Sequence, residues 1–138
     1  MRSVELLLAV LVLLPSGCST SQRDYDFLVG HALTQHAGDL NATTVVLAPG
    51  LPEEVVAAAA KHYKVIDQSA VVPVKGYDLA PGLAVLQDVT INGNEARVRV
   101  QTGPIWTGAN LSCGGNHTAL YRKSSSGWTA GETETVVC

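Results

Sequence analysis

The feature of this sequence that most constrains its fold is an Asn92-Gly93 dipeptide between two runs of apolar and β-branched residues. Asn-Gly is a strong signal for the two-residue turn of a β-hairpin, because both turn positions adopt a positive φ. The flanking runs, 85–91 and 95–101, therefore predict two antiparallel strands.

The predicted strand over 95–101 alternates apolar and charged side chains. We expect Arg97 and Arg99 to project from the outer face of the sheet, with Asp88 opposite Arg97. Arg122 and Lys123 are expected to project from the same face, and a face of one sign can attract an anionic partner, so Arg97 and Arg99 are candidate binding residues. The alternative is an ordinary solvated face, because Asp88 and Glu95 carry negative charges nearby. The residues expected to face the core are Ala96, Val98 and Val100.

A second hairpin is predicted near the C-terminus, where residues 124–127 (Ser-Ser-Ser-Gly) separate two strand-forming runs. If this four-residue turn pairs Lys123 with Trp128, the register places His117 opposite Glu134. His117 is therefore a candidate for an ion pair or for a binding role. The same register predicts one apolar face made of Ala119, Tyr121, Trp128 and Ala130.

Helical patterns precede these strands. From Asp24 to Gly38 apolar side chains recur at helical spacing, with Asp24 as the expected N-cap and Gly38 as the stop. Pro52, two glutamates at the start and basic residues at the end predict a second helix over 52–64. Residues 43–48 are typical of a strand, whereas 67–82 contain Pro and Gly and are expected to be an irregular or edge segment. The expected buried stripe of the first helix is Tyr25, Leu28, Val29, Ala32, Leu33 and His36.

The overall composition fits one globular domain. The chain has 138 residues, of which 46% are hydrophobic, enough for a single core. Helices followed by antiparallel strands predict an α+β fold, with one or two N-terminal helices packed on a curved antiparallel β-sheet, a meander. The net charge of −3 does not suggest a nucleic-acid partner.

The first residues have the pattern of a secretory signal peptide. Arg2 supplies a positive charge, and residues 6–14 form an unbroken apolar run that is too short for a permanent membrane-spanning helix. Ser16-Gly17-Cys18 resembles the lipobox of bacterial lipoproteins, in which the cysteine becomes the first residue and is lipidated. We therefore expect a signal peptide over 1–17, lipidated Cys18 with a tether over 18–23, and an α+β domain over 24–138.

The lipobox resemblance also implies a location. Ser19 follows the cysteine, as in lipoproteins of the outer membrane, so the protein is expected to face the periplasm as a lipid-anchored component of the bacterial envelope. More than one acyl chain would anchor it stably. The alternative is cleavage just beyond Cys18, which would release a soluble secreted protein.

The cysteine count agrees with lipidation. The chain has three cysteines, so lipidated Cys18 leaves Cys113 and Cys138 as a pair for a disulfide in an oxidising compartment. The hairpin register around 124–127 sets these two residues opposite each other. Closing that loop would stabilise the domain by about 3 kcal/mol in the chain-entropy model. Two free buried thiols are the alternative.

The side chains that could act in catalysis or bind a metal do not form a catalytic pattern in the sequence. His31 and His36 are five positions apart on different helix faces, and no cysteine or carboxylate completes a usual metal set. Ser112 near His117 is the single local candidate for a nucleophile and base, without a Gly-x-Ser-x-Gly elbow. We expect neither an enzyme nor a bound metal or cofactor.

Trp106 is a further candidate binding residue. It lies in a loop rich in Gly and Pro, residues 103–108, where a large aromatic side chain is costly to expose unless it docks on something. It either packs on the domain's own core or contacts a partner.

The second half of the chain resembles that of small bacterial envelope lipoproteins. The resemblance covers the run Ala96–Val100, then Cys113-Gly-Gly, the run Thr118–Lys123, and Gly127-Trp128. Some of these proteins are similar to cystatin-like or nuclear-transport-factor-like folds, in which a curved sheet cradles a helix. The resemblance implies a fold and a compartment but no catalytic residue.

The functional expectation combines these observations. We expect a non-catalytic binding or envelope-accessory module, held at the membrane by its N-terminal lipid and acting on an envelope protein partner. The alternative is a secreted inhibitor or small-ligand carrier that uses the Trp106 loop and the concave face of the sheet.

Overall fold

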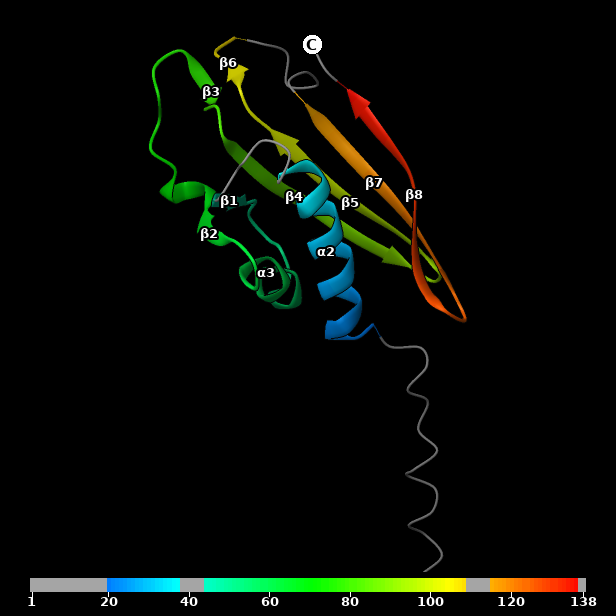
Figure 1. The fold of residues 1–138 in the computed structure, drawn as a ribbon. Helices are drawn as coiled ribbons and strands as arrows, with labels where there is room; N and C mark the ends of the chain where they lie inside the picture. Colours follow the sequence, from blue (N-terminus) through cyan, green and yellow to red (C-terminus); the bar gives the residue numbers. More distant parts are fainter. Residues whose placement is uncertain (1–19, 38–43, 109–114, 137–138) are drawn as a thin grey trace, which may run out of the picture.

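A computed structural model describes residues 20–37, 44–108 and 115–136. Figure 1 shows two helices lying against one face of a twisted sheet. The elements in chain order are α2 (Gln22–His36), β1 (Thr44–Leu47), α3 (Glu53–Ala60), β2 (Lys64–Asp67), the 3₁₀ turn η3 (Gln68–Ala70), β3 (Tyr77–Leu79), β4 (Leu83–Asn92), β5 (Glu95–Thr102), β6 (Ile105–Trp106), β7 (Asn116–Ser124) and β8 (Gly127–Val136).

The expected α+β fold is confirmed, and the sheet is mostly antiparallel. Its six strands lie in the order β2-β1-β4-β5-β7-β8. β1 is parallel to both of its neighbours, so a simple antiparallel meander does not describe this end of the sheet. The reason is that the chain crosses back through α3 between β1 and β2, which brings β2 alongside in the same direction. Among the described residues, no helix has the length and apolar character that crossing a membrane requires.

Helix α2 begins earlier than the sequence predicts. Its N-cap is Ser21, whose side chain accepts a hydrogen bond from the Asp24 backbone, while the Asp24 carboxylate accepts from the Ser21 backbone. Asp24 is therefore the third residue of a capping box and not the N-cap. Gln22 and Arg23, which we assigned to the tether, are helical.

The main core lies between the helices and the sheet. The central residues of the α2 stripe, Leu28, Val29, Ala32 and Leu33, are all fully buried, as predicted. They pack with Val55, Ala58 and Ala59 of α3. This helix is shorter than expected and ends at Ala60. The sheet contributes Val45, Leu47, Ala84, Leu86, Ala96, Val98, Val100, Ala119 and Tyr121.

The β4–β5 hairpin forms, but in a different register from the predicted one. Asn92 pairs with Glu95, so the turn residues are Gly93 and Asn94, and Asp88 lies opposite Arg99 instead of Arg97. Gly93 has a φ of 64°, which glycine adopts at no steric cost. The predicted facing of β5 is confirmed, because Ala96, Val98 and Val100 are buried and Arg97 and Arg99 are exposed.

Strand β4 also contains a β-bulge at Gln87, farther from the turn. The pairing of β4 with β5 shifts between Leu86 and Asp88, which leaves Gln87 as an extra residue. Leu86 before the bulge and Val89 after it both pack into the main core. Gln87 and Asp88 therefore both project from the opposite face of the sheet.

The β7–β8 hairpin pairs Lys123 with Trp128, as predicted, but Ser124 also pairs with Gly127, so the turn has two residues. A second shift between Ala119 and Tyr121 places His117 opposite Thr135, not Glu134. Trp128 packs against the main core. Ala130 pairs with Tyr121 in the predicted register but is exposed, because β8 is the edge strand of the sheet.

This shift also removes the register argument for a disulfide. From Ala119 back to Asn116, each β7 residue pairs one position later in β8 than the predicted register gives. When this pairing is extended along the two strands, the two cysteines no longer come opposite each other. Cys113 and Cys138 lie outside the described residues, as does Cys18. Both the disulfide and the lipidation stay predictions.

The segment expected to be irregular contributes a second layer. Strands β3 and β6 form a small antiparallel sheet of their own. We call these two strands and the segment 68–76 the flap. Leu79 and Ile105 of the flap pack on Val46 and Val85, on the face of the main sheet opposite the helices. The structure thus has a second, smaller core behind the first.

Candidate functional site

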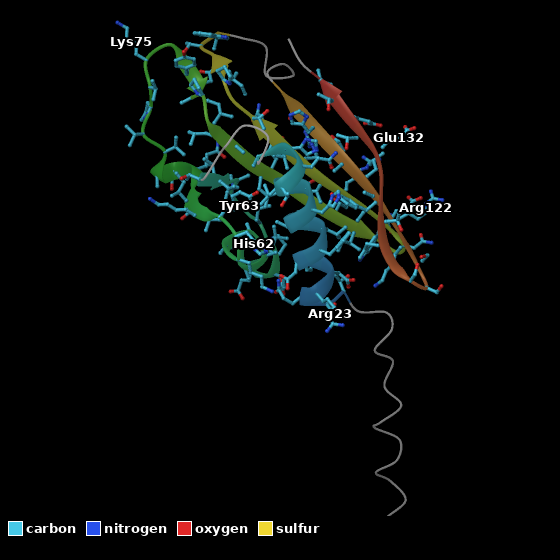
Figure 2. The ribbon with its side chains drawn as sticks, viewed as in Figure 1. Arg23, His62, Tyr63, Lys75, Arg122 and Glu132 are labelled. Carbon is cyan, nitrogen blue, oxygen red and sulfur yellow. The ribbon has the colours of Figure 1, made fainter. Side chains whose placement is uncertain are left out.

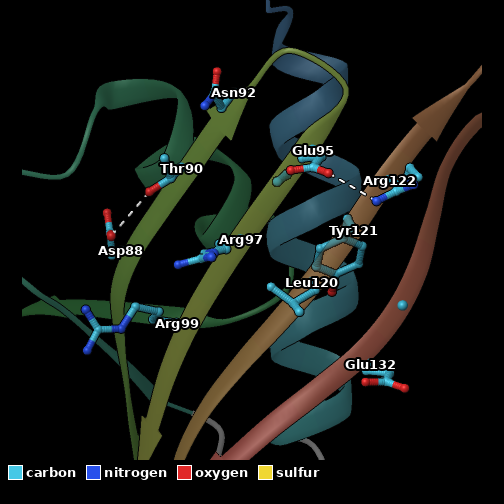
Figure 3. A pocket seen from close by; sticks show the side chains of 12 residues that line it. Asp88, Thr90, Asn92, Glu95, Arg97, Arg99, Leu120, Tyr121, Arg122 and Glu132 are labelled. Atoms are coloured by element: carbon cyan, nitrogen blue, oxygen red, sulfur yellow. Dashed lines mark hydrogen bonds and ion pairs between the residues drawn. The ribbon is translucent and has the colours of Figure 1, made fainter.

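The back face of the main sheet, opposite α2 and α3, holds both described hollows of the structure. The flap covers this face over β1 and the first part of β4. Over β5, β7 and the rest of β4 no described element lies on it, and Figure 3 shows these strands with helix α2 behind them. An uncovered sheet face with charged side chains is a natural surface for binding.

The larger hollow, which we call the basin, has a volume of about 620 Å³. It is shallow and lies over β4, β5, β7 and β8 (Figure 3). Leu120 is the one large apolar side chain in its lining, apart from the mostly buried Tyr121. The polar side chains that line it are Asp88, Thr90, Asn92, Glu95, Arg97, Arg99, Arg122 and Glu132.

Arg97 and Arg99 are the distinctive groups of the basin. They are exposed neighbours on one side of β5, and Figure 3 shows both side chains extending toward β4. Among the described residues, no carboxylate lies within ion-pairing distance of either guanidinium. By contrast, Arg122 Nη2 donates to Glu95 Oε1 at 3.1 Å. Two guanidinium groups are therefore available to an anion.

The acidic groups of the basin do not neutralise this pair directly. Asp88 lies opposite Arg99 in the ladder, but its carboxylate accepts a hydrogen bond from Thr90 Oγ1 at 3.3 Å. Glu132 lies on the far side, over β8, in Figure 3. The cationic side chains thus face the β4 half of the basin, in which Asp88 also lies, and Glu132 faces the β8 half.

The second hollow, which we call the chamber, lies between the flap and the main sheet and has a volume of about 480 Å³. The residues that line it include the buried Val46, Leu79, Val85 and Ile105 together with Gln68, Asp78, Gln87 and Gln101. Val72 at its margin is 79% exposed, and Val74 is 46% exposed. The chamber therefore presents both polar and apolar groups.

The basin and the chamber adjoin at the β4 bulge. Gln87 lines the chamber and the next residue, Asp88, lines the basin. On β5, Arg99 lines the basin and Gln101 lines the chamber, a separation of about 7 Å along a strand. The bulge joins the two hollows because it turns two consecutive side chains to the same face.

A pair of glutamines marks this junction. Gln87 Nε2 donates to Gln101 Oε1 at 2.9 Å. Gln87 Oε1 is buried without a hydrogen-bond donor among the described residues. A buried acceptor without a donor costs about 1–3 kcal/mol.

His117 lies away from this site, on the helix side of the sheet. Its ring stacks on His36 with centroids 4.4 Å apart. Nε2 lies 3.1 Å from Thr102 Oγ1, and Nδ1 lies 3.1 Å from Thr135 Oγ1. Burial lowers the pKa of His117. These contacts tie the end of α2 to β5, β7 and β8, and they do not join His117 to the arginines.

Trp106 lies on the flap, apart from the basin and from His117. It lies in strand β6 and is 58% exposed, and its ring stacks on Tyr77 with centroids 4.6 Å apart. It does not belong to either core and does not line either hollow. The four predicted binding residues therefore separate into Arg97 with Arg99 in the basin, Trp106 on the flap, and His117 near α2.

The remaining histidines make structural contacts or stand apart. His31 Nδ1 lies 2.9 Å from the hydroxyl of Tyr121, whose pKa burial raises to about 12. Figure 2 shows His62 just past α3, far from the basin. The described ranges contain no group of three or more residues that could hold a metal ion. Ser112 lies outside those ranges.

Our sequence analysis missed the chamber and its junction with the basin. The bulge has no clear signal in the sequence, because apolar residues occupy the even positions 84 and 86 as well as the odd positions 83, 85, 89 and 91. Only the structure shows that Ala84 and Leu86, and then Val89 and Ile91, face the main core. Nothing local in 68–79 indicates that the flap folds back over Val46 and Val85.

Comparison of the chain with protein-family models, with curated proteins and with solved structures finds no match. The site must therefore be interpreted from its own chemistry.

Proposed function

We propose that the protein is an exported, lipid-anchored module of the bacterial envelope that binds an anionic ligand in the basin and does not catalyse a reaction. The observation that carries this proposal is the pair of exposed guanidinium groups, Arg97 and Arg99, without a carboxylate partner among the described residues. Guanidinium groups bind carboxylates and phosphates through charge-assisted hydrogen bonds.

The expected location is the outer membrane, facing the periplasm, with the lipid on Cys18. The arrangement of the domain is compatible with such an anchor. The first turn of α2 and the flap lie at opposite ends of the molecule in Figure 1. A lipid attached just before α2 would leave both the basin and the flap accessible to the periplasm.

The basin is open to water, so the affinity for a simple anion should be modest. Glycerol phosphate is a suitable probe, because it presents one phosphate and no apolar chain. In an NMR titration we expect it to shift the amide signals of β4 and β5 around the basin, with a dissociation constant on the order of 1 mM. The Arg97→Gln/Arg99→Gln variant should lose these shifts.

Arg23→Gln is the matched control for that variant. Arg23 is also an exposed arginine, and Figure 2 shows it at the start of α2, away from the basin. The control should leave the titration unchanged. Equal shifts in the double variant, or none in the wild type, would contradict binding at this site.

The anchor is tested separately. Intact-mass measurement of the mature protein should show a chain that starts at Cys18 and carries acyl groups. The Cys18→Ser variant should move from the membrane fraction to the soluble fraction. A chain that begins after residue 18, or an unmodified thiol there, would favour the secreted alternative.

A second candidate function rests on Trp106, the exposed aromatic side chain of the flap. As a secreted inhibitor or carrier, or with an envelope protein as partner, the protein would use the stacked Tyr77 and Trp106 rings as a contact surface. Aromatic side chains are common anchors of such contacts. Loss of partner binding in Trp106→Ala, with the Arg97→Gln/Arg99→Gln variant unaffected, would favour this candidate.

A further inference from the structure

We infer that the ligand of the basin is an amino dicarboxylic acid, with its two carboxylates on Arg97 and Arg99 and its ammonium group on Asp88. This inference rests on the proposed function and adds the chemical class of the ligand. It follows from three charged side chains that lie on two adjacent strands and have no ion-pair partner among the described residues.

Strand geometry sets the spacing of the two arginines. Arg97 and Arg99 flank Val98 on β5, so they lie on the same face of the sheet, about 7 Å apart along the strand. Both are exposed, and both extend toward β4 (Figure 3). A guanidinium group binds a carboxylate through two parallel hydrogen bonds. At this spacing each arginine can hold a carboxylate of its own, and one ligand with two carboxylates satisfies both.

Asp88 adds a negative charge beside Arg99. It lies directly opposite Arg99 in the β4–β5 ladder, where facing Cα atoms are about 5 Å apart. Asp88 is only half-buried, and no cation of the described chain lies within ion-pairing distance of its carboxylate. The carboxylate accepts a hydrogen bond from Thr90, but an ionised carboxylate has room for several donors. Asp88 can therefore bind an ammonium group.

The three charges together specify the ligand. A simple dicarboxylate would satisfy both arginines but would bring a carboxylate close to the negative charge of Asp88, which repels it. An ammonium group beside that carboxylate replaces this repulsion with an attraction. In an amino acid one carbon atom carries both groups, which matches the placement of Arg99 and Asp88 on adjacent strands. The second carboxylate of the ligand then reaches Arg97.

The neighbours of Arg97 decide the orientation of the ligand. Thr90 on β4 and Leu120 on β7 face Arg97 in the two ladders, and both are uncharged. The other arginine that lines the basin, Arg122, is paired with Glu95. The carboxylate on Arg97 therefore has no acid directly opposite it. The ammonium group belongs at the other end of the ligand, where Asp88 faces Arg99.

Three probes separate the charges of the ligand. They are 2-aminopimelate, which has two carboxylates and an ammonium group, pimelate, which lacks the ammonium group, and 2-aminoheptanoate, which lacks the second carboxylate. In extended pimelate the two carboxyl carbons lie about 7 Å apart, which matches the length of two residues in a strand. In NMR titrations 2-aminopimelate should bind about fivefold more tightly than pimelate. It should bind about tenfold more tightly than 2-aminoheptanoate.

Variants test the contacts with matched controls. Asp88→Asn should abolish the preference for 2-aminopimelate over pimelate, and its retained binding of pimelate shows that the variant is folded. Asp67→Asn is its control and should keep the preference, because Asp67 is exposed and lines neither hollow. Arg97→Gln should abolish the preference for 2-aminopimelate over 2-aminoheptanoate, while Arg23→Gln should keep it.

The results separate this inference from the proposed function. If glycerol phosphate shifts the basin signals but 2-aminopimelate binds no more tightly than pimelate, the inference fails and the proposed function stands. Equal affinity for 2-aminopimelate and 2-aminoheptanoate, or an unchanged preference in Asp88→Asn, would also overturn the inference. These comparisons in the wild-type protein do not depend on the folding of any variant. If neither glycerol phosphate nor 2-aminopimelate perturbs β4 and β5, both the inference and the proposed function fail.

Discussion

Trp128 Nε1 donates a hydrogen bond of 2.9 Å to Asp24 Oδ1, which joins edge strand β8 to the first turn of α2. The same oxygen lies 3.1 Å from Lys123 Nζ, and Asp24 also belongs to the capping box with Ser21. One carboxylate thus caps the helix and holds the β7–β8 hairpin against it. This clamp secures the end of the domain from which the predicted lipid anchor extends.

The clamp predicts a loss of stability in acid. Burial by itself raises the pKa of Asp24, but hydrogen bonds from the Ser21 backbone, Trp128 and Lys123 outweigh it and lower the pKa from 3.8 to about 2. The ionised carboxylate therefore stabilises the fold above pH 3.8, and this contribution is lost as the pH falls to about 2. The shift corresponds to about 2 kcal/mol in the free energy of unfolding.

Urea denaturation at several pH values measures this effect. Asp24→Asn should be less stable than wild type at neutral pH, and the difference should shrink toward pH 2. Asp26 must be kept in both proteins, because hydrogen bonds from Lys61 and Gln22 lower its pKa as well. A constant difference between the two proteins across this range would show that the charge of Asp24 is not what stabilises the clamp.

His117 predicts a separate pH dependence at higher pH. Burial lowers its pKa below 6.5, and a proton on it would place a cation against the stacked ring of His36. The folded state binds fewer protons than the unfolded chain, so stability should decrease as the pH falls below about 6.5. His117→Gln should reduce this decrease in the urea midpoint. His62→Gln, at an exposed position, is the control and should leave the pH dependence unchanged.

Trp106→Ala should change stability little. The side chain is 58% exposed, so the variant mainly loses the stack on Tyr77, worth about 1 kcal/mol. Trp128→Ala removes a half-buried ring and its hydrogen bond to Asp24, and should cost about 3 kcal/mol. Thermal or urea unfolding of the two variants measures both values. A large loss in Trp106→Ala would mean that this ring is part of a core.

Gly103→Ala should displace the flap. A Cβ at this position would lie 2.2 Å from the carbonyl oxygen of Ala80, a backbone atom that cannot yield without moving the chain. We expect a loss of about 2 kcal/mol or more in the free energy of unfolding, measured by urea denaturation.

Gly30→Ala is the matched control for this substitution. A Cβ at Gly30 has no neighbour within 4 Å, and alanine should stabilise α2 by about 0.5–1 kcal/mol. Wild-type stability in Gly103→Ala would show that the contact with Ala80 does not hold the flap.

Several features of the fold could be predicted because they depend on local periodicity. The buried stripe of α2 follows from helical spacing, and the alternation along 95–101 places Val98 inward and Arg97 outward. The Lys123–Trp128 pair follows from the turn residues between them. Each of these features is determined by side chains within one element or one hairpin.

The registers could be predicted only in part. The turn at Gly93–Asn94, one residue later than predicted, moves the partner of Asp88 from Arg97 to Arg99. A bulge in the β7–β8 pair moves the partner of His117 from Glu134 to Thr135. A bulge adds one residue to a strand without a strong signal in its composition. The pairing then depends on which side chains the opposing core accepts.

The sequence by itself determined the class of the fold, the order of its two helices and two hairpins, and the outward position of Arg97 and Arg99. Only the tertiary structure decided that β1 runs parallel to its neighbours, that the flap folds over Val46 and Val85, and that the basin and the chamber meet at Gln87. The physical reason is the range of the interactions. Local spacing sets which face of an element is apolar, whereas contacts between distant segments select the partner that covers it.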